Sequence, residues 1–163
     1  MFHFIIADRK RKDIRSISVR ELCASADINR STFYEYYNSL YDVLPELEET
    51  VQKELFSNLE LSGDRPENAL IGFVQTLKDH RETMMILMGS SIDPDFPDRL
   101  LHHPVIMKYL TLPETLSVEQ RAYTAEFYLY GCYRILSMWL SGGCKENPEE
   151  IAALRIDICK RDI

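Results

Sequence analysis

The stretch SVRELCASADINRSTFYEYY, residues 18–37, decides the fold because two short helical patterns meet within it. Ser18 precedes the first pattern and can accept a hydrogen bond from a backbone N–H of the first turn. The apolar residues that then recur at helical spacing are Val19, Leu22, Cys23 and Ala26. We therefore predict a helix over residues 19–26 with one buried face.

A break in the periodicity falls at Asp27, and a second helix follows it. Asp tolerates the left-handed backbone conformation that a tight turn needs better than most residues other than glycine. Asn29 can cap a helix that runs to about Tyr37 and buries Phe33. The side chains expected to point outward are Arg30, Ser31, Thr32, Tyr34 and Glu35. Such a pair of helices is typical of a helix-turn-helix motif, whose second helix enters the major groove of DNA.

The residues ISVRELCASADINRSTFYEYYNSLYDVL, 17–44, resemble the DNA-binding segment of the TetR/AcrR family of transcriptional regulators, which reads roughly ITV-x-ELC-x-x-AGINRSTFY-x-HY-x-x-KYDLL. The resemblance implies an all-α fold with two parts. A three-helix helix-turn-helix domain is expected over residues 1–45, and a helical regulatory and dimerisation domain over residues 46–163. The candidate DNA-binding residues are Ser18, Arg30, Ser31, Thr32, Tyr34, Glu35 and Tyr36.

Two of these residues suit contacts with bases. Arg30 can make a bidentate contact to a base or to a phosphate, and Thr32 can touch a thymine methyl group. By the resemblance, Ser18 and Tyr34 position phosphates.

Three residues depart from the family's common form. Leu40 stands where the family usually has a phosphate-contacting Lys, which supplies salt-dependent affinity. Glu35 adds a negative charge that can read a cytosine amino group or repel phosphate. Tyr36 replaces a His. All three departures weaken the expected binding of DNA.

The first sixteen residues, MFHFIIADRKRKDIRS, are shorter than the four-turn helix that the family normally has there. We expect a helix of two to three turns. The basic run over residues 9–12 is interpreted either as a solvated helix end or as an arm that contacts the DNA backbone. The apolar start is too short to span a bilayer and lacks the layout of a signal peptide.

Charge is divided unevenly along the 163 residues. Residues 1–45 have seven Lys and Arg against six Asp and Glu, and residues 46–163 have twelve against twenty, which together give the net charge of −7. The acidic part should point away from DNA, and the weakly basic part favours a dimer that doubles the contacts. The four cysteines show neither a zinc-binding spacing nor a disulfide framework, so we expect a cytoplasmic protein with no membrane partner.

Beyond the motif, periodicity and capping residues predict six more helices, over residues 39–58, 66–79, 81–88, 98–110, 118–141 and 148–161. Pro45 should bend the first of these or make it begin later. A linker is expected over residues 61–66. His102 and His103 fall inside the fourth helix, and adjacent His residues do not share a helix face, so no metal site is expected there.

The helix over residues 118–141 has more apolar surface than one small core can bury, which implies a second partner. The resemblance implies a homodimer formed through the last two helices. A dimer with twofold symmetry can present two recognition helices to two operator half-sites.

An apolar small-molecule effector could lie among the helices between residues 66 and 140. Its candidate contacts are Phe73, Leu77, Met84, Met88, Met107, Tyr109, Phe127 and Tyr130. The alternative interpretation of these residues is ordinary core.

No catalytic or cofactor motif is recognisable, so we expect neither an enzyme nor a cofactor. The sequence predicts a dimeric regulator that binds double-stranded operator DNA, in the form of a ligand-responsive repressor. The alternative is a co-regulator derived from this family that binds other proteins and has weakened DNA binding.

Overall fold

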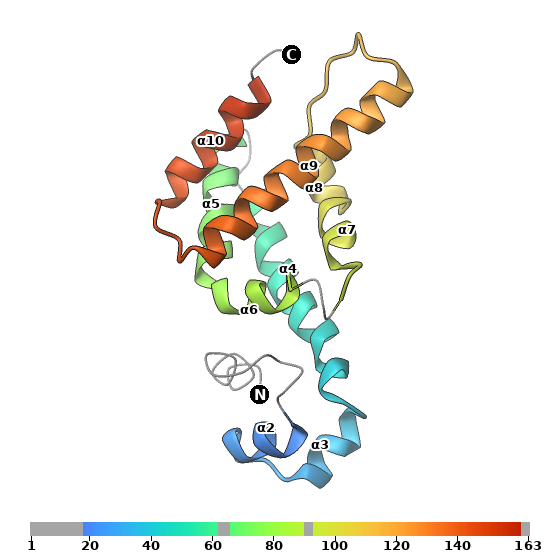
Figure 1. Ribbon diagram of the computed structural model, residues 1–163, viewed down its shortest axis with the longest axis vertical. Coiled ribbons are helices and arrows are strands. Elements are labelled where there is room, and N and C mark those ends of the chain that lie inside the picture. Colours follow the sequence, from blue (N-terminus) through green and yellow to red (C-terminus); the bar gives the residue numbers. More distant parts are fainter. Residues whose placement is uncertain (1–17, 62–65, 90–92, 161–163) are drawn as a thin grey trace.

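The computed structural model describes residues 18–61, 66–89 and 93–160, and the regular elements within these ranges are all helices (Figure 1). The helix predicted in the first sixteen residues and most of the predicted linker lie outside the described residues. In Figure 1, α2 and α3 lie at one end, α4 rises from them, and the later helices gather around its far part. The all-α architecture predicted from the sequence is confirmed.

The first two described helices are α2, Val19–Ser25, and α3, Arg30–Tyr36. The Ser18 hydroxyl accepts a hydrogen bond from the Glu21 N–H at 3.2 Å, and the Glu21 carboxylate accepts one from the Ser18 N–H at 2.9 Å. This reciprocal capping box starts α2. Asp27 has a φ of 53°, and the Asn29 side chain accepts a hydrogen bond from the Ser31 N–H at 3.1 Å. Both predicted caps and the predicted turn residue are confirmed.

The helix predicted from residue 39 begins in two stages. A 3₁₀ turn, η2, covers Leu40–Val43, and Ser39 caps it. The α-helix α4, Leu44–Leu61, starts after this turn. Pro45 lies in the first turn of α4, where its missing N–H would have no partner within the helix. Of the two expected effects of Pro45, the later start is the one observed.

Four further helices agree closely with the prediction. Ser117 and Gln120 form a capping box that starts the longest of them. That helix stops at Gly142, and the chain then turns through Gly143 at a φ of 92°. The bounds are α5 Pro66–Asp79, α6 Arg81–Leu87, α9 Val118–Ser141 and α10 Pro148–Lys160.

The single helix predicted over residues 98–110 is wrong. The structure has two short helices instead, α7, Phe96–Leu101, and α8, Pro104–Lys108. Pro104 cannot donate a backbone hydrogen bond, and its ring disfavours a helical conformation at the residue before it. His103 therefore has an extended backbone, and its ring accepts a hydrogen bond from the Val105 N–H at 3.3 Å.

The described residues pack into two hydrophobic clusters. The larger one joins α4 to α10, with residues from every helix between them. The smaller one lies within the motif and its flanking turn, with a single contribution from α6. Its buried members are Leu22, Cys23, Phe33, Leu40, Val43, Leu44 and Ile86. Helix α6 therefore contributes to both clusters, because Met84 and Leu87 belong to the larger one.

Candidate nucleic-acid interface and effector cavity

The outer face of α3 is open to solvent. Phe33 is buried and anchors the helix, while Tyr34 is 55% exposed and Tyr36 is 76% exposed. The Tyr34 ring meets the Phe33 ring edge to face, with the centroids 5.5 Å apart. The sequence-predicted interface residues are all exposed, namely Ser18, Arg30, Ser31, Thr32, Tyr34, Glu35 and Tyr36.

Leu40 is a core residue at this interface rather than a lost surface contact. Its side chain is only 7% exposed and belongs to the same cluster as Phe33. Where the family's common form has a phosphate-contacting Lys, this chain therefore has a side chain that the 3₁₀ turn directs into the smaller cluster. Tyr41, the next residue, is exposed beside the interface. Tyr41 is not among the residues predicted for this interface, although its aromatic type next to a helix cap is a signal in the sequence.

Carboxylates outnumber cations in the described part of this interface. Residues 18–44 contain two Arg against four Asp and Glu. Two of the four carboxylates cap helices: Glu21 caps α2, and Asp42 accepts the N–H groups of Asn38 and Ser39 at 2.7 and 3.0 Å. These backbone hydrogen bonds lower the pKa of Asp42, which keeps it charged. The described part of this candidate interface therefore has a net negative charge.

The end of α3 is tied to α4. The Tyr37 hydroxyl donates a hydrogen bond to the Glu46 carboxylate at 2.8 Å, and this contact raises the pKa of Tyr37. The Tyr37 ring also packs against Phe33, with the centroids 5.3 Å apart. This hydrogen bond and this ring contact join the C-terminal end of α3 to α4 and to the anchor Phe33.

A small apolar cavity of about 40 Å³ lies inside the larger cluster. Its walls come from α5, α6, α7, α8 and α9. The residues that line it are Phe73, Leu77, Met84, Met88, Leu100, Leu101, Ile106, Leu129, Cys132, Tyr133 and Leu136. Four of the eight predicted effector contacts are among them: Phe73, Leu77, Met84 and Met88.

The other four predicted contacts lie elsewhere. Met107 is exposed, and Phe127 is 65% exposed. The hydroxyl of Tyr109 donates to the Leu59 carbonyl, and that of Tyr130 donates to the Asp98 carboxylate. The break at Pro104 changes the direction of α8, and α9 turns a different face to the cavity. The missed residues of α9 are Leu129, Cys132, Tyr133 and Leu136, whose helical spacing was a signal in the sequence.

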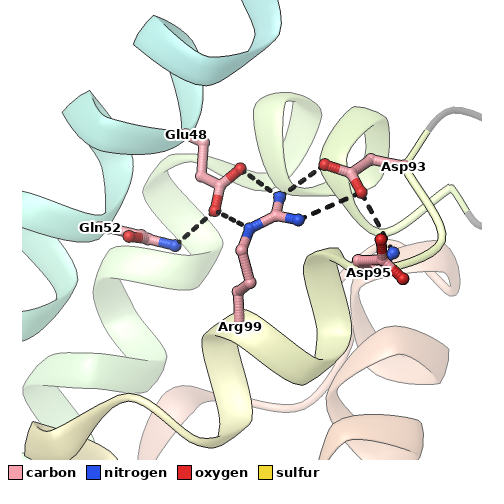
Figure 2. Close-up of polar contacts among 5 residues, drawn as sticks. All are labelled: Glu48, Gln52, Asp93, Asp95 and Arg99. Carbon is pink, nitrogen blue, oxygen red and sulfur yellow. Dashed lines mark hydrogen bonds and ion pairs between the residues drawn. The ribbon is translucent and has the colours of Figure 1, made fainter.

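An Arg joins α4 to the segment that leads into α7, as Figure 2 shows. The Arg99 guanidinium donates to the Glu48 carboxylate at 3.2 and 2.7 Å and to the Asp93 carboxylate at 3.3 and 2.5 Å. Gln52 donates a further hydrogen bond to Glu48 at 2.8 Å. The contact with Arg99 lowers the pKa of Asp93. We call Arg99, Glu48 and Asp93 the Arg99 clamp. The two residues that follow Arg99 in the chain, Leu100 and Leu101, line the cavity.

Comparisons with known proteins agree with this architecture. The TetR-type family model described as a transcriptional regulator C-terminal region matches residues 64–160, more than half of the chain. The chain belongs to the TetR family of transcriptional regulators. The matched range of this TetR-family regulator covers α5 to α10, so it includes the cavity and excludes α3.

Among solved structures, the regulator is similar to one titled "Dihydroxyacetone kinase operon activator DhaS". The two are 15% identical, with a TM-score of 0.61, over 96% of this chain and 90% of that one. At this identity the likeness shows a shared fold. No curated protein matches the chain in sequence. In the described part of the chain, no helix has the length and hydrophobicity to cross a membrane.

Proposed function

We propose that this TetR-family regulator binds double-stranded operator DNA as a homodimer in the cytoplasm and represses transcription until an apolar small molecule fills its cavity. The observation that carries the proposal is the outer face of α3, where Arg30, Thr32 and Tyr34 are exposed around the buried anchor Phe33. Such a helix fits the major groove and can present a bidentate donor to base edges.

The proposal divides the chain near residue 45. Residues 1–45 bind DNA, and residues 46–163 bind the effector and the second subunit. The smaller cluster supports this division, because six of its seven buried members precede residue 45. Helix α4 continues from one part into the other.

An exposed apolar stripe on α9 supports the dimer. Tyr123, Phe127, Tyr130 and Met138 recur at helical spacing and are all exposed. Gly131 lies beside them, and a Cβ added there would meet no atom of the described chain within 4 Å. A glycine without a close neighbour in its own subunit suits the close approach of a partner helix. We propose that this stripe packs in a homodimer with the outward face of α10.

A route from the cavity to DNA runs through the Arg99 clamp. A ligand that pushes on Leu100 and Leu101 moves α7, and the clamp passes this movement to Glu48 on α4. Because Glu46 on the same helix holds Tyr37, the outer face of α3 follows. Such movements change the separation of the two recognition helices in a dimer.

Selection of operator sequences from a random DNA pool, followed by binding titrations at several salt concentrations, tests the proposal. We expect a selected operator to bind at least about a thousandfold more tightly than random duplex, with affinity that falls steeply with salt. A reporter gene behind that operator distinguishes repression from activation. Equal, weak binding to every duplex would overturn the proposal.

Arg30→Ala is the sharpest variant for this test. We expect it to weaken operator binding by about 1–3 kcal/mol and to relax the choice of base, because a bidentate contact is lost. Arg20→Ala is the matched control, since it removes the same charge from an exposed position on α2. An unchanged footprint and affinity for Arg30→Ala would contradict the assigned role.

The second candidate function is a co-regulator that binds another protein. The excess of carboxylates over residues 18–44 and the three exposed tyrosines, Tyr34, Tyr36 and Tyr41, favour this alternative. Weak binding to every duplex in the titration would favour it over a DNA-binding regulator.

A further inference from the structure

We infer that the cavity takes a small, uncharged, mainly apolar molecule with one hydrogen-bonding oxygen, and that this oxygen pairs with the hydroxyl of Tyr133. The inference rests on the proposed ligand response and adds the chemical class of the ligand.

The cavity wall excludes a charged ligand. Its eleven lining residues are hydrocarbon or aromatic side chains together with two thioethers and one thiol, and none is charged. An ion taken from water into such surroundings would lose its hydration without gaining a partner. The wall therefore selects an uncharged molecule.

Tyr133 lines the cavity, and its hydroxyl is a buried polar group without a hydrogen-bond partner among the described residues. Its oxygen is buried, and no described residue gives it a hydrogen bond. Other polar groups of the same core are satisfied, since the Thr76 hydroxyl donates to the Gly72 carbonyl at 2.9 Å and the Trp139 indole to the Glu146 carbonyl at 3.1 Å. A buried hydroxyl without a partner is rare in native structures and calls for an explanation. A ligand oxygen supplies one.

The hydroxyl acts as a donor at neutral pH. Burial raises the pKa of Tyr133, so the group keeps its proton. The oxygen of an alcohol, a phenol or a carbonyl compound can accept this hydrogen bond.

The size of the cavity sets the size of the ligand. A volume of about 40 Å³ is far below the roughly 300 Å³ at which pockets for drug-sized ligands begin. Met84 and Met88 form part of the wall, and their flexible side chains can move to admit a single ring. The ligand is therefore of about one ring in size.

Three single-ring probes separate these features: phenol and toluene, which are nearly equal in size, and benzoate, which is charged and two atoms larger. Each is titrated into the full chain, and binding is measured by calorimetry. We expect phenol to bind about fivefold more tightly than toluene, because only phenol offers an oxygen to Tyr133. Benzoate should not bind measurably.

Tyr133→Phe should remove the preference for phenol and leave the affinity for toluene unchanged. The variant should unfold at the same temperature as the parent or at a higher one, because the hydroxyl makes no hydrogen bond in the free chain. Tyr128→Phe is the matched control: Tyr128 lies on α9 but does not line the cavity, so the preference should persist.

Four results would overturn the inference: equal binding of phenol and toluene, a preference that survives in Tyr133→Phe, tight binding of benzoate, or no binding of any probe. Operator binding is measured on the same samples. Selective operator binding without the phenol preference would defeat the inference alone. A phenol preference without selective operator binding would defeat the proposed function alone.

Discussion

Asp27 holds the turn between α2 and α3 in a conformation that few side chains adopt, with a φ of 53°. Asp27→Gly should raise the free energy of unfolding by about 0.5 kcal/mol, because glycine has no Cβ to strain the left-handed backbone. Asp27→Ala should lower it by about 1 kcal/mol. Urea unfolding measures both variants. Equal effects of the two substitutions would show that the charge of Asp27 matters more than its backbone.

His102 makes part of the stability depend on pH. Its ring nitrogen pairs with the Glu126 carboxylate at 2.8 Å, and this contact, followed by the Asp98 carbonyl, raises the pKa of His102. A raised pKa in the folded state stabilises the fold fully below the ordinary value of about 6.5, and the contribution is lost as the pH rises through the raised pKa.

Glu126→Gln should reduce this pH dependence, because the larger cause of the raised pKa is lost while the contact with the Asp98 carbonyl remains. Because both side chains are about half exposed, the expected change is at most about 0.5 kcal/mol. Urea unfolding of the parent and the variant between about pH 5.5 and about pH 8.5 measures the difference. The two proteins should converge at the alkaline end, and a constant gap across the range would contradict the assignment.

The caps and the turn residue were predictable from the sequence because each depends on neighbours within three positions. Ser18, Asn29 and Asp27 all take the predicted roles. The packing partners of Leu40 were not predictable in the same way. Leu40 shares the smaller cluster with Ile86, which lies far along the chain. Sequence rules for caps and turns use neighbouring residues, so they cannot predict contacts between residues that are far apart in the sequence.

At the scale of the helices, the Arg99 clamp should hold α4 and α7 together. Glu48→Gln should lower the free energy of unfolding by up to about 1 kcal/mol, because it weakens a bidentate charged contact that is partly exposed. Glu49→Gln is the matched control, one residue along the same helix and exposed. Urea unfolding of both variants gives the comparison.

A double-mutant cycle with Arg99→Ala isolates the clamp itself. The double variant should lose less stability than the sum of the losses in the two single variants. In either single variant, phenol should change the affinity for the operator less than it does in the parent protein. Additive effects of the two substitutions would show that the contact in Figure 2 contributes nothing measurable.

Three helix starts were predicted correctly from a cap or a proline: those at Ser117, Pro66 and Pro148. Pro104 also marks a helix start. A single helix was predicted there because apolar residues recur at helical spacing on both sides of Pro104. The faces of α9 could not be assigned from the sequence, because apolar residues surround the whole helix. Only packing decides that Leu129 is buried and Phe127 is exposed.

At the scale of the whole molecule, the exposed stripe on α9 predicts the oligomeric state. The double variant Tyr123→Glu, Phe127→Glu should be a monomer, because charges replace the apolar surface that we assign to the interface. Its operator affinity should fall by about a hundredfold when the two half-sites no longer bind together. Light scattering and binding titrations measure the two effects.

Tyr41→Glu is the control for this variant, since it adds the same charge at an exposed tyrosine away from α9. It should remain a dimer. A double variant that also remains a dimer would exclude the α9 stripe as the interface.

The all-α class and the family were predictable from one segment, residues 17–44, whereas the cavity was predicted only in part. This cavity is formed by side chains from five helices. The apolar pattern of one helix does not predict which of its faces packs against the other helices. The four predicted residues that do line it come from α5 and the region of α6, where periodicity was clear.

The place of Ile86 in the smaller cluster has a consequence for protein engineering. A chimaera could join residues 1–45 of this chain to the later helices of a relative. In this molecule Ile86 of α6 packs in the smaller cluster, whose other buried members all precede residue 45. A junction at residue 45 would therefore leave a void where Ile86 packs. Such a chimaera should keep α6 of this chain together with residues 1–45, or the relative should have a side chain of similar shape in place of Ile86.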